Sequence, residues 1–284
     1  MSERILLLHP GEMGSSIGAS LRSNGHAVFW IREGRSQASA ERAQSAGLEP
    51  IATLRDGLGG VDHVISVCPP DAALAVAREV SAAGFAGTYL DANAVSPATA
   101  REIHAGVGDT FVDGGIVGPP AWKEGTTRLY LSGPKAAQVA CWFEGSPTDA
   151  RAIDGGAGAA SALKMAYAAF TKGSAALLLA VRALAEREGV TDPLLEEWDL
   201  SQPSLARRSE LTARGTSEKA WRFEGEMREI AASFQAAGLP GGFHEAAAEV
   251  YRRMRELKDV EGGADLEWVL EALLRDAGAD RPGA

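Results

Sequence analysis

The chain has 284 residues, of which 45% are hydrophobic and 23% charged, and its formal net charge is −10. This length suits one large domain or two smaller ones, and the composition is that of a globular protein with a sizeable core. Acidic residues outnumber basic ones in both halves of the chain, so nucleic acid and anionic membranes are poor candidate partners.

The cysteines and the apolar segments bear on the cellular compartment. Cys68 and Cys141 form no Cys-x-x-Cys pair and cannot build a disulfide framework, which favours a reducing cytoplasm. The N-terminus leads into a short strand, without the long apolar region of a signal peptide. The most apolar helical stretch, between Lys172 and Arg182, is far shorter than the ~20 residues that span a bilayer. We therefore expect a cytoplasmic protein that does not enter a membrane.

The first half of the chain alternates short apolar runs with helical patterns. The runs predict strands at 5–8, 27–31, 64–67, 88–90, 110–112 and 129–131. Helical patterns lie between the early runs, at 13–23, 36–46, 70–83 and 97–105. Strands that are apolar throughout and separated by helices predict an α/β fold with a doubly wound parallel sheet, covered by helices on both faces.

The pattern changes near residue 154, after which the sequence predicts only helices. They are expected at 159–188, 192–199, 203–213, 216–237, 241–257 and 265–276. The last residues, 277–284, are small and polar and are expected to be frayed. The sequence thus predicts an N-terminal α/β domain over residues 1–154 and an all-α domain over residues 155–284.

The turn after the first strand has the features of a dinucleotide-binding loop, with the sequence His9-Pro10-Gly11-Glu12-Met13-Gly14. A strand, a glycine turn and a helix start bring free backbone N–H groups and a helix dipole to one point, which suits a pyrophosphate. Gly11 and Gly14 occupy the second and third glycine positions of G-x-G-x-x-G, whereas His9 replaces the first. We predict that the Gly11–Gly14 backbone, including Glu12 and Met13, binds the cofactor, with the Glu12 side chain directed away from phosphate. The alternative is a glycine turn without a ligand.

The end of the second predicted strand bears on the choice of cofactor. An acidic residue there would bind the ribose hydroxyls of NAD, and arginine would accommodate the 2′-phosphate of NADP. Arg32, Arg35 and Ser36 resemble a 2′-phosphate pocket, although Glu33 lies among them. We favour NADP, with NAD as the alternative.

Five segments follow one another in a characteristic order: Gly11–Gly14 with Asn24–Val28 downstream, Ser66–Pro70, Asp91–Pro97, Asp113–Pro119 and Gly158–Lys164. Together they resemble the β-hydroxyacid dehydrogenase superfamily, which includes 3-hydroxyisobutyrate dehydrogenase and 6-phosphogluconate dehydrogenase and to which imine reductases are related. The C-terminal part resembles a family named only as a domain of unknown function, on the segments Ser161–Leu179 and Leu239–His244. The resemblance implies that residues 1–154 form a dinucleotide-binding Rossmann domain and residues 155–284 a helical domain for substrate binding and dimerisation.

The resemblance assigns the proton-transfer role to Lys164, near the start of the long helix. Hydride delivery to a carbonyl leaves an alkoxide that needs a proton, and a partly desolvated lysine can supply it. The family usually has asparagine one turn later, where this chain has Tyr167. Lys164 and Tyr167, three residues apart, share one helix face, so either side chain is a candidate proton donor. The alternatives are a solvated lysine and a core tyrosine.

Further candidate contacts lie at strand ends and in one turn. Cys68, Pro69 and Asn93 follow two strands at the ligand-binding edge of the sheet and are expected near the cofactor, as is Arg228, which matches in register a basic residue at the family's active-site edge. The expected substrate contacts are Ser96, Val117, Gly118, Pro119 and Trp122. Ser96 is equally well explained as a helix cap. The family's Ser-Gly-Gly substrate turn reads Val117-Gly118-Pro119 here, so a serine that usually holds a substrate carboxylate is absent.

These observations predict an NADP(H)-dependent oxidoreductase acting on a small hydroxyacid or carbonyl, and a homodimer formed through the helical domain. Tyr167 and the missing serine keep an imine reductase open, and the His9-Pro10 turn keeps a non-catalytic dinucleotide-binding protein open. The five histidines lack metal-ligand spacing, and there is no G-x-S-x-G elbow or G-x-x-x-x-G-K-[ST] loop. We therefore expect no metal site, hydrolase or P-loop.

Overall fold

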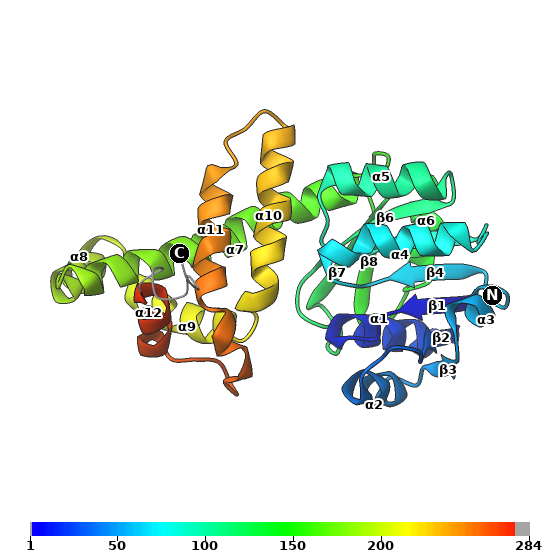
Figure 1. The fold of residues 1–284 in the computed structure, drawn as a ribbon, viewed down its shortest axis with the longest axis horizontal. Coiled ribbons are helices and arrows are strands. Elements are labelled where there is room, and N and C mark those ends of the chain that lie inside the picture. The colour runs from blue at the N-terminus through cyan, green and yellow to red at the C-terminus, as the bar shows by residue number, and fades with distance from the viewer. Residues whose placement is uncertain (1, 276–284) are drawn as a thin grey trace, which may run out of the picture. The chain divides into compact units, whose positions relative to one another are not determined.

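An eight-stranded sheet forms the centre of the N-terminal part of the chain in the computed structural model, which describes residues 2–275 (Figure 1). The strands are β1 (Arg4–Leu8), β2 (Ala27–Ile31), β3 (Glu49–Ile51), β4 (His63–Ser66), β5 (Thr88–Asp91), β6 (Phe111–Val117), β7 (Thr127–Ser132) and β8 (Thr148–Ala152). Their order in the sheet is β3-β2-β1-β4-β5-β6-β7-β8. The predicted α/β class is confirmed.

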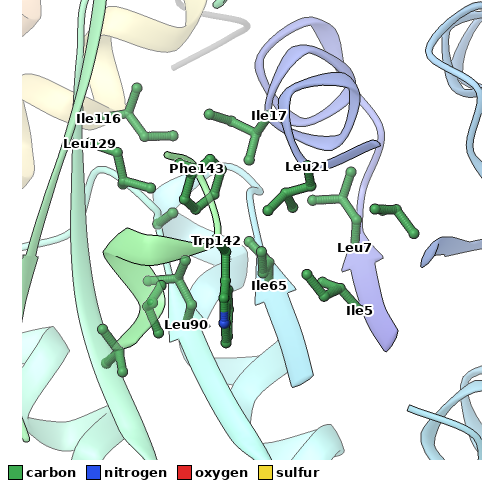
Figure 2. Close-up of a cluster of buried hydrophobic side chains, with 14 of the residues drawn as sticks. Ile5, Leu7, Ile17, Leu21, Ile65, Leu90, Ile116, Leu129, Trp142 and Phe143 are labelled. Carbon is green, nitrogen blue, oxygen red and sulfur yellow. The ribbon is translucent and has the colours of Figure 1, made fainter. Parts of the chain in front are cut away.

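Helices cover both faces of this sheet. They are α1 (Glu12–Ser23), α2 (Gln37–Ser45), α3 (Leu54–Leu58), α4 (Pro70–Ala82), α5 (Pro97–Val107) and α6 (Ala136–Cys141). Ile5 and Leu7 of β1 join the cluster built with α1, α2 and α6 (Figure 2), and Leu6 and Leu8 join the cluster built with α4 and α5. Successive residues of a strand point to opposite faces, so a strand buried on both is apolar throughout.

The sequence predicted a parallel sheet, but one pair of neighbouring strands is antiparallel. Strands β1 to β6 pair in parallel, but β7 runs antiparallel to β6. Only residues 118–126 connect these two strands. A parallel connection needs a crossover of about a dozen residues or more, usually containing a helix, so this short segment can only reverse the chain.

The predicted strands and helices of the first half all form, with small shifts at their ends. The short elements β3, α3, α6 and β8 were not predicted from the sequence, and β8 has the polar sequence Thr-Asp-Ala-Arg-Ala. Strand β8 lies at the edge of the sheet and pairs only with β7. An edge strand buries fewer side chains, so it lacks the apolar run that revealed the central strands.

The second half of the chain is helical, as predicted. Its elements are α7 (Ala159–Arg187), α8 (Thr191–Ser201), α9 (Leu205–Ser217), α10 (Ala220–Ala236), α11 (Gly242–Arg253), the 3₁₀ turn η1 (Arg255–Asp259) and α12 (Leu266–Leu274). Helices α10 and α11 pack side by side (Figure 1), and Met227, Ile230 and Tyr251 are fully buried. The tail predicted to fray, 277–284, lies outside the described residues.

The chain divides into two compact units, Met1–Ala166 and Tyr167–Ala284, so the division lies inside α7. The sequence had placed it after residue 154, where the strands end. The first two turns of α7 belong to the sheet unit because hydrogen bonds and close backbone packing fasten them to β6, as described below.

Helix α7 is the one helix among residues 2–275 that is long and apolar enough to cross a membrane by length and composition. Half of its most apolar window is buried inside the structure. The buried core helix of a globular protein passes the same test, so this property is weak evidence for a membrane span.

Candidate functional site

The turn after β1 keeps the geometry of a dinucleotide-binding loop although it lacks the first glycine. His9 adopts a left-handed backbone conformation with φ of 71°, which glycine adopts without strain and other residues rarely take. The Gly11 N–H donates a hydrogen bond of 2.8 Å to the His9 carbonyl, closing the turn. A Cβ on Gly14 would lie 2.4 Å from that carbonyl oxygen, so this position requires glycine for close strand–helix packing.

The start of α1 is open to an anion. Gly11 occupies the N-cap with no side-chain cap hydrogen bond, and nothing lies within 4 Å of where its Cβ would be. Within residues 2–275, the N–H groups of Met13 and Gly14 have no acceptor. Free N–H groups at the positive end of a helix dipole form a site for phosphate, so the predicted backbone contacts fit a pyrophosphate group.

His9 contributes no positive charge to this turn. Burial lowers the pKa of His9 to about 4, and the nearby charge of Arg35 lowers it further. Its Nδ1 is buried without a hydrogen-bond partner in the described part of the chain. The cationic group near the turn is therefore Arg35.

The segment after β2 presents the two candidate arginines at the surface. Arg32 and Arg35 are exposed, and the Arg32 N–H donates to the carbonyl of Ile51 at 2.9 Å. The Ser36 hydroxyl caps α2 by accepting the Ser39 N–H at 3.3 Å. The arginines can thus meet a phosphate from solvent, whereas Ser36 already has a structural role.

Asn93, predicted to contact the cofactor, ties together the ends of β4 and β5. Its Oδ1 accepts the Cys68 N–H at 2.5 Å, and its Nδ2 donates to Ser66 at 3.1 Å and to Asp91 at 2.8 Å. Burial raises the pKa of the Cys68 thiol to about 11, so this thiol is neutral. Asn93 therefore positions the Cys68–Pro69 backbone, and Pro69 is the N-cap of α4.

Two of the candidate substrate residues, Ser96 and Val117, have structural roles in the fold. The Ser96 hydroxyl caps α5, accepting the Thr99 N–H at 3.2 Å, which is the capping role that the sequence had left open. The side chain of Val117 is buried in β6, so a substrate contact here would come from the backbone.

The loop between β6 and β7, residues 118–126, is fastened at several points. A Cβ on Gly118, whose φ is 122°, would lie 2.2 Å from the Thr126 carbonyl oxygen. The Thr127 hydroxyl donates to the Pro119 carbonyl at 2.6 Å. The Ala121 N–H donates to Ser16 of α1 at 2.9 Å, which connects the loop to the helix of the phosphate turn. The Trp122 side chain is 58% exposed on this loop.

A row of buried polar residues crosses the sheet beside these loops. Ser66, Asp91, Asp113 and Ser132 are register partners on β4, β5, β6 and β7, and each is at most 1% exposed. Burial raises the pKa of Asp91 to about 7, against the hydrogen bonds from Asn93, and the charge of Asp113 raises it further. The sequence patterns predicted no role for Asp91 or Asp113. A carboxylate in an otherwise apolar strand could have indicated a buried polar network, because a buried charge is too unfavourable to persist without hydrogen-bond partners.

Lys164 lies on the part of α7 that packs against β6. A Cβ on Gly115 would lie 2.7 Å from the Ala160 carbonyl oxygen and 3.0 Å from the Lys164 Cβ. Glycine at this position therefore allows the helix and its lysine to approach the strand. Tyr167, one turn later, is 48% exposed and opens the second unit.

Arg228, the remaining predicted cofactor contact, lies on α10 in the helical unit. Its guanidinium forms an ion pair of 2.9 Å with Glu224, and its side chain is 65% exposed. This is the geometry of a solvated helix pair. Among residues 2–275, no group of three or more histidine, cysteine or acidic side chains is arranged to hold a metal ion.

Comparison with known proteins connects this geometry to a family. The chain is 30% identical over 194 residues to an uncharacterised 28.5 kDa protein of Methanothermus fervidus, an alignment that covers 68% of this chain and 75% of the relative. Residues 185–254 match a domain of unknown function, DUF1932. A conserved protein of unknown function, described as structurally similar to 3-hydroxyacid dehydrogenases, is 26% identical with a TM-score of 0.67, over 92% of this chain and all of that one.

Other solved structures share the fold. The 3-hydroxyisobutyrate dehydrogenase of Mycobacterium tuberculosis with L-serine has a TM-score of 0.71 at 18% identity, over 96% of this chain and 100% of that one. A reductive aminase from Aspergillus terreus with NADPH has a TM-score of 0.56 at 18% identity, over 95% and 99% of the two chains. The fold is therefore one that NAD(P)-dependent dehydrogenases and imine-reducing enzymes share. The chain belongs to the same family as the uncharacterised Methanothermus fervidus protein, carries the C-terminal domain of unknown function DUF1932, and is structurally similar to the 3-hydroxyacid dehydrogenase superfamily.

Proposed function

We propose that the protein is an NADP(H)-dependent oxidoreductase that interconverts a small carbonyl compound and its alcohol, such as a hydroxyacid. The observation that carries this proposal is the position of Lys164, on a helix fastened against β6 in the same unit as an open phosphate-binding turn. A hydride donor and a proton donor are the two groups that carbonyl reduction requires.

The chain's own residues account for cofactor binding in this proposal. The N–H groups at the start of α1 would hold the pyrophosphate, and Arg32 and Arg35 would pair with the 2′-phosphate. NADPH, when bound, supplies the hydride. The loss of one arginine–phosphate pair weakens binding by about 10-fold or more.

Calorimetric titration with NADPH and NADH tests cofactor binding. We expect NADPH to bind more tightly, and Arg35→Ala to weaken NADPH binding with little effect on NADH. Arg55→Ala, an exposed arginine on α3, is the control. Equal affinities for NADPH and NADH in the unaltered protein would contradict the proposed preference for NADP(H) and would make NAD(H) the proposed cofactor.

Lys164 carries the proton in the proposed reaction. As the carbonyl carbon accepts the hydride, its oxygen gains the C=O electron pair, and the lysine ammonium donates a proton to that oxygen. In the reverse direction, the neutral amine removes the hydroxyl proton as hydride leaves the carbon. Tyr167 is the alternative donor, because it follows Lys164 by one turn of the same helix.

A panel of small aldehydes, ketoacids and hydroxyacids tests the substrate class through nicotinamide absorbance. Aldehydes without a carboxylate should be reduced at least as well as those with one, because the turn Val117-Gly118-Pro119 offers backbone N–H groups but no serine hydroxyl. A strict requirement for the carboxylate would contradict this part of the proposal.

Reduction of a C=N bond is the second candidate activity. The tyrosine at position 167, the absent serine and the shared fold with an imine reductase from Myxococcus stipitatus in complex with NAD⁺ favour it. Turnover of cyclic imines without turnover of any carbonyl would establish it in place of the first.

A non-catalytic dinucleotide-binding protein is the third candidate. The left-handed backbone of His9 is conformationally unfavourable for a residue other than glycine, and its imidazole, with a pKa lowered to about 4, carries no positive charge that would attract phosphate. NADPH binding without turnover of any carbonyl or imine would favour this candidate. No binding of either cofactor would remove all three.

We also propose that the protein forms a homodimer through α7. Phe170, Leu177 and Leu184 repeat every seven residues along this helix and are 72%, 50% and 62% exposed. A continuous apolar stripe on a monomer is unfavourable in water and suits a helix partner. Leu177→Glu should convert a dimer into a monomer in light scattering, whereas Leu200→Glu, at an 83% exposed position on α8, should not.

A further inference from the structure

Asp113 is a buried carboxylate that accepts hydrogen bonds from four groups. Its Oδ2 accepts the N–H groups of Gly158 at 2.9 Å and Ser161 at 3.0 Å, and its Oδ1 accepts the Ser161 hydroxyl at 2.6 Å. The Ser132 hydroxyl lies 3.2 Å from Oδ2. A carboxylate that is 1% exposed needs such donors, because it has lost its hydration.

Three of these four donors belong to the start of α7. Gly158 and Ser161 supply N–H groups that the helix itself cannot satisfy, so Asp113 acts as an N-cap provided by another element. The Ser132 hydroxyl also accepts the Ala160 N–H at 3.1 Å and thus joins the same network. The negative carboxylate additionally faces the positive end of the helix dipole.

The same strand also sets how closely the helix approaches. Gly115 follows Asp113 by two residues and therefore faces the same side of β6. The space that a Cβ would occupy on Gly115 is taken by the Ala160 carbonyl and the Lys164 Cβ. Asp113 thus fixes the start of α7 on the strand, and Gly115 allows Lys164 to lie close to β6.

We propose that Asp113 is a positioning residue for Lys164: its carboxylate holds the first turn of α7 on β6 and keeps the lysine ammonium at the reacting oxygen. This role rests on the proposed function of Lys164. Asp113 itself does not touch substrate or cofactor in the proposal.

Asp113→Asn, which keeps the size of the side chain and removes its charge, tests the proposal without any substrate. The amide cannot accept all the donors that face it, so hydrogen exchange at residues 159–164 should accelerate about five- to tenfold. Removing a negative charge from the helix start should also shift the pH midpoint for acylation of Lys164, followed by peptide mass spectrometry, to lower pH. Asp109→Asn, an exposed aspartate four residues upstream, is the matched control.

The two readouts separate the possible outcomes. Faster exchange with a shifted Lys164 midpoint supports the proposal. Faster exchange with an unchanged midpoint would reduce Asp113 to a structural cap, and values equal to those of the control would overturn the proposal altogether. If Asp113→Asn does not fold, Ser161→Ala removes only the hydroxyl donor and keeps the carboxylate, so exchange at residues 159–164 should accelerate by a smaller factor; exchange equal to that of the control would then overturn the proposal. Because neither readout uses turnover, an inactive enzyme would overturn the proposed function without altering this result.

Discussion

The two units of the protein bury charged groups in different ways. In the sheet unit, Asp91 and Asp113 are register partners on neighbouring strands and are held by N–H and hydroxyl donors. Neither forms an ion pair with a basic side chain among residues 2–275. In the helical unit, Lys172 of α7 pairs with Glu226 of α10, and its ammonium lies 4.7 Å from the ring centre of Phe223.

The buried charges of the helical unit neutralise each other, whereas the two buried carboxyl groups of the sheet unit have no cation in the described part of the chain to neutralise them. The Lys172–Glu226 pair cancels its own charge, and the Tyr251 hydroxyl closes the cluster by donating to the Lys172 carbonyl at 2.9 Å. Burial raises the pKa of Asp91 to about 7, the charge of Asp113 adds a smaller increase, and no basic side chain among residues 2–275 pairs with either carboxyl group. Perturbed carboxyl groups that no cation neutralises are typical of functional sites, whereas a paired buried ion more often serves the fold.

The largest expected effect is on catalysis by Lys164, which lies in the sheet unit with the two carboxyl groups. Lys164→Ala should lower kcat for carbonyl reduction by about 10² to 10⁴-fold, because it removes the proposed proton donor. NADPH affinity, measured by calorimetry, should change little. Lys258→Ala, an exposed lysine in η1, is the control. Full activity in Lys164→Ala would transfer the role to Tyr167, which Tyr167→Phe then tests.

Breaking the Lys172–Glu226 ion pair should lower the stability of the fold rather than catalysis. Lys172→Met removes the ammonium that pairs with the Glu226 carboxylate, on a side chain that is 13% exposed, and should cost about 3 kcal/mol in the free energy of unfolding by urea. The double variant Lys172→Met/Glu226→Leu should recover most of this loss, since both charges of the pair are then removed. A double variant as unstable as the single one would show that the pair is not the cause.

The carboxyl pair should make stability depend on pH. The pKa of Asp91 is about 7 in the folded protein and about 4 when unfolded, so the folded state holds a proton that the unfolded state lacks between these values. Stability from this group is therefore fully present below about pH 4 and declines as the pH rises to about 7, by at most ~1.4 kcal/mol per unit. The thermal midpoint should fall between pH 5 and 7, and Asp91→Asn should flatten that slope. An equal slope in both proteins would contradict the assignment.

The smallest effect is expected at a partly exposed cluster on α11. Arg252, and more weakly Arg253, lower the pKa of Glu249 to about 2 by hydrogen bonding. A lowered acid pKa adds stability above the unfolded value and loses it as the pH falls towards 2. Because the Glu249 side chain is 43% exposed, solvent screening reduces this to well under 1 kcal/mol. Glu249→Gln should shift the urea midpoint at pH 7 only slightly, and a shift as large as that of Lys172→Met would contradict the comparison.

The sequence was informative where a pattern is local. Central strands such as β1 are apolar throughout because both faces are covered, and α7 is a long apolar run, so both were predictable. The phosphate turn was found because Gly11 and Gly14 stand between a strand and a helix. Short edge elements such as β8 were missed, because few of their side chains are buried.

The sequence by itself determined the α/β class, the helical second half and the glycine turn, since these follow from residues close together in the chain. The candidate role of Lys164 came from the order of five segments that resemble the β-hydroxyacid dehydrogenase superfamily. Only the tertiary structure decided that β7 reverses direction, that His9 takes the backbone conformation of a glycine, and that Asp113 caps a helix 45 residues further along the chain. The physical reason is that these features depend on which groups the fold brings together. A buried carboxylate and a helix start find each other across the sheet because neither can satisfy its hydrogen bonds within its own segment.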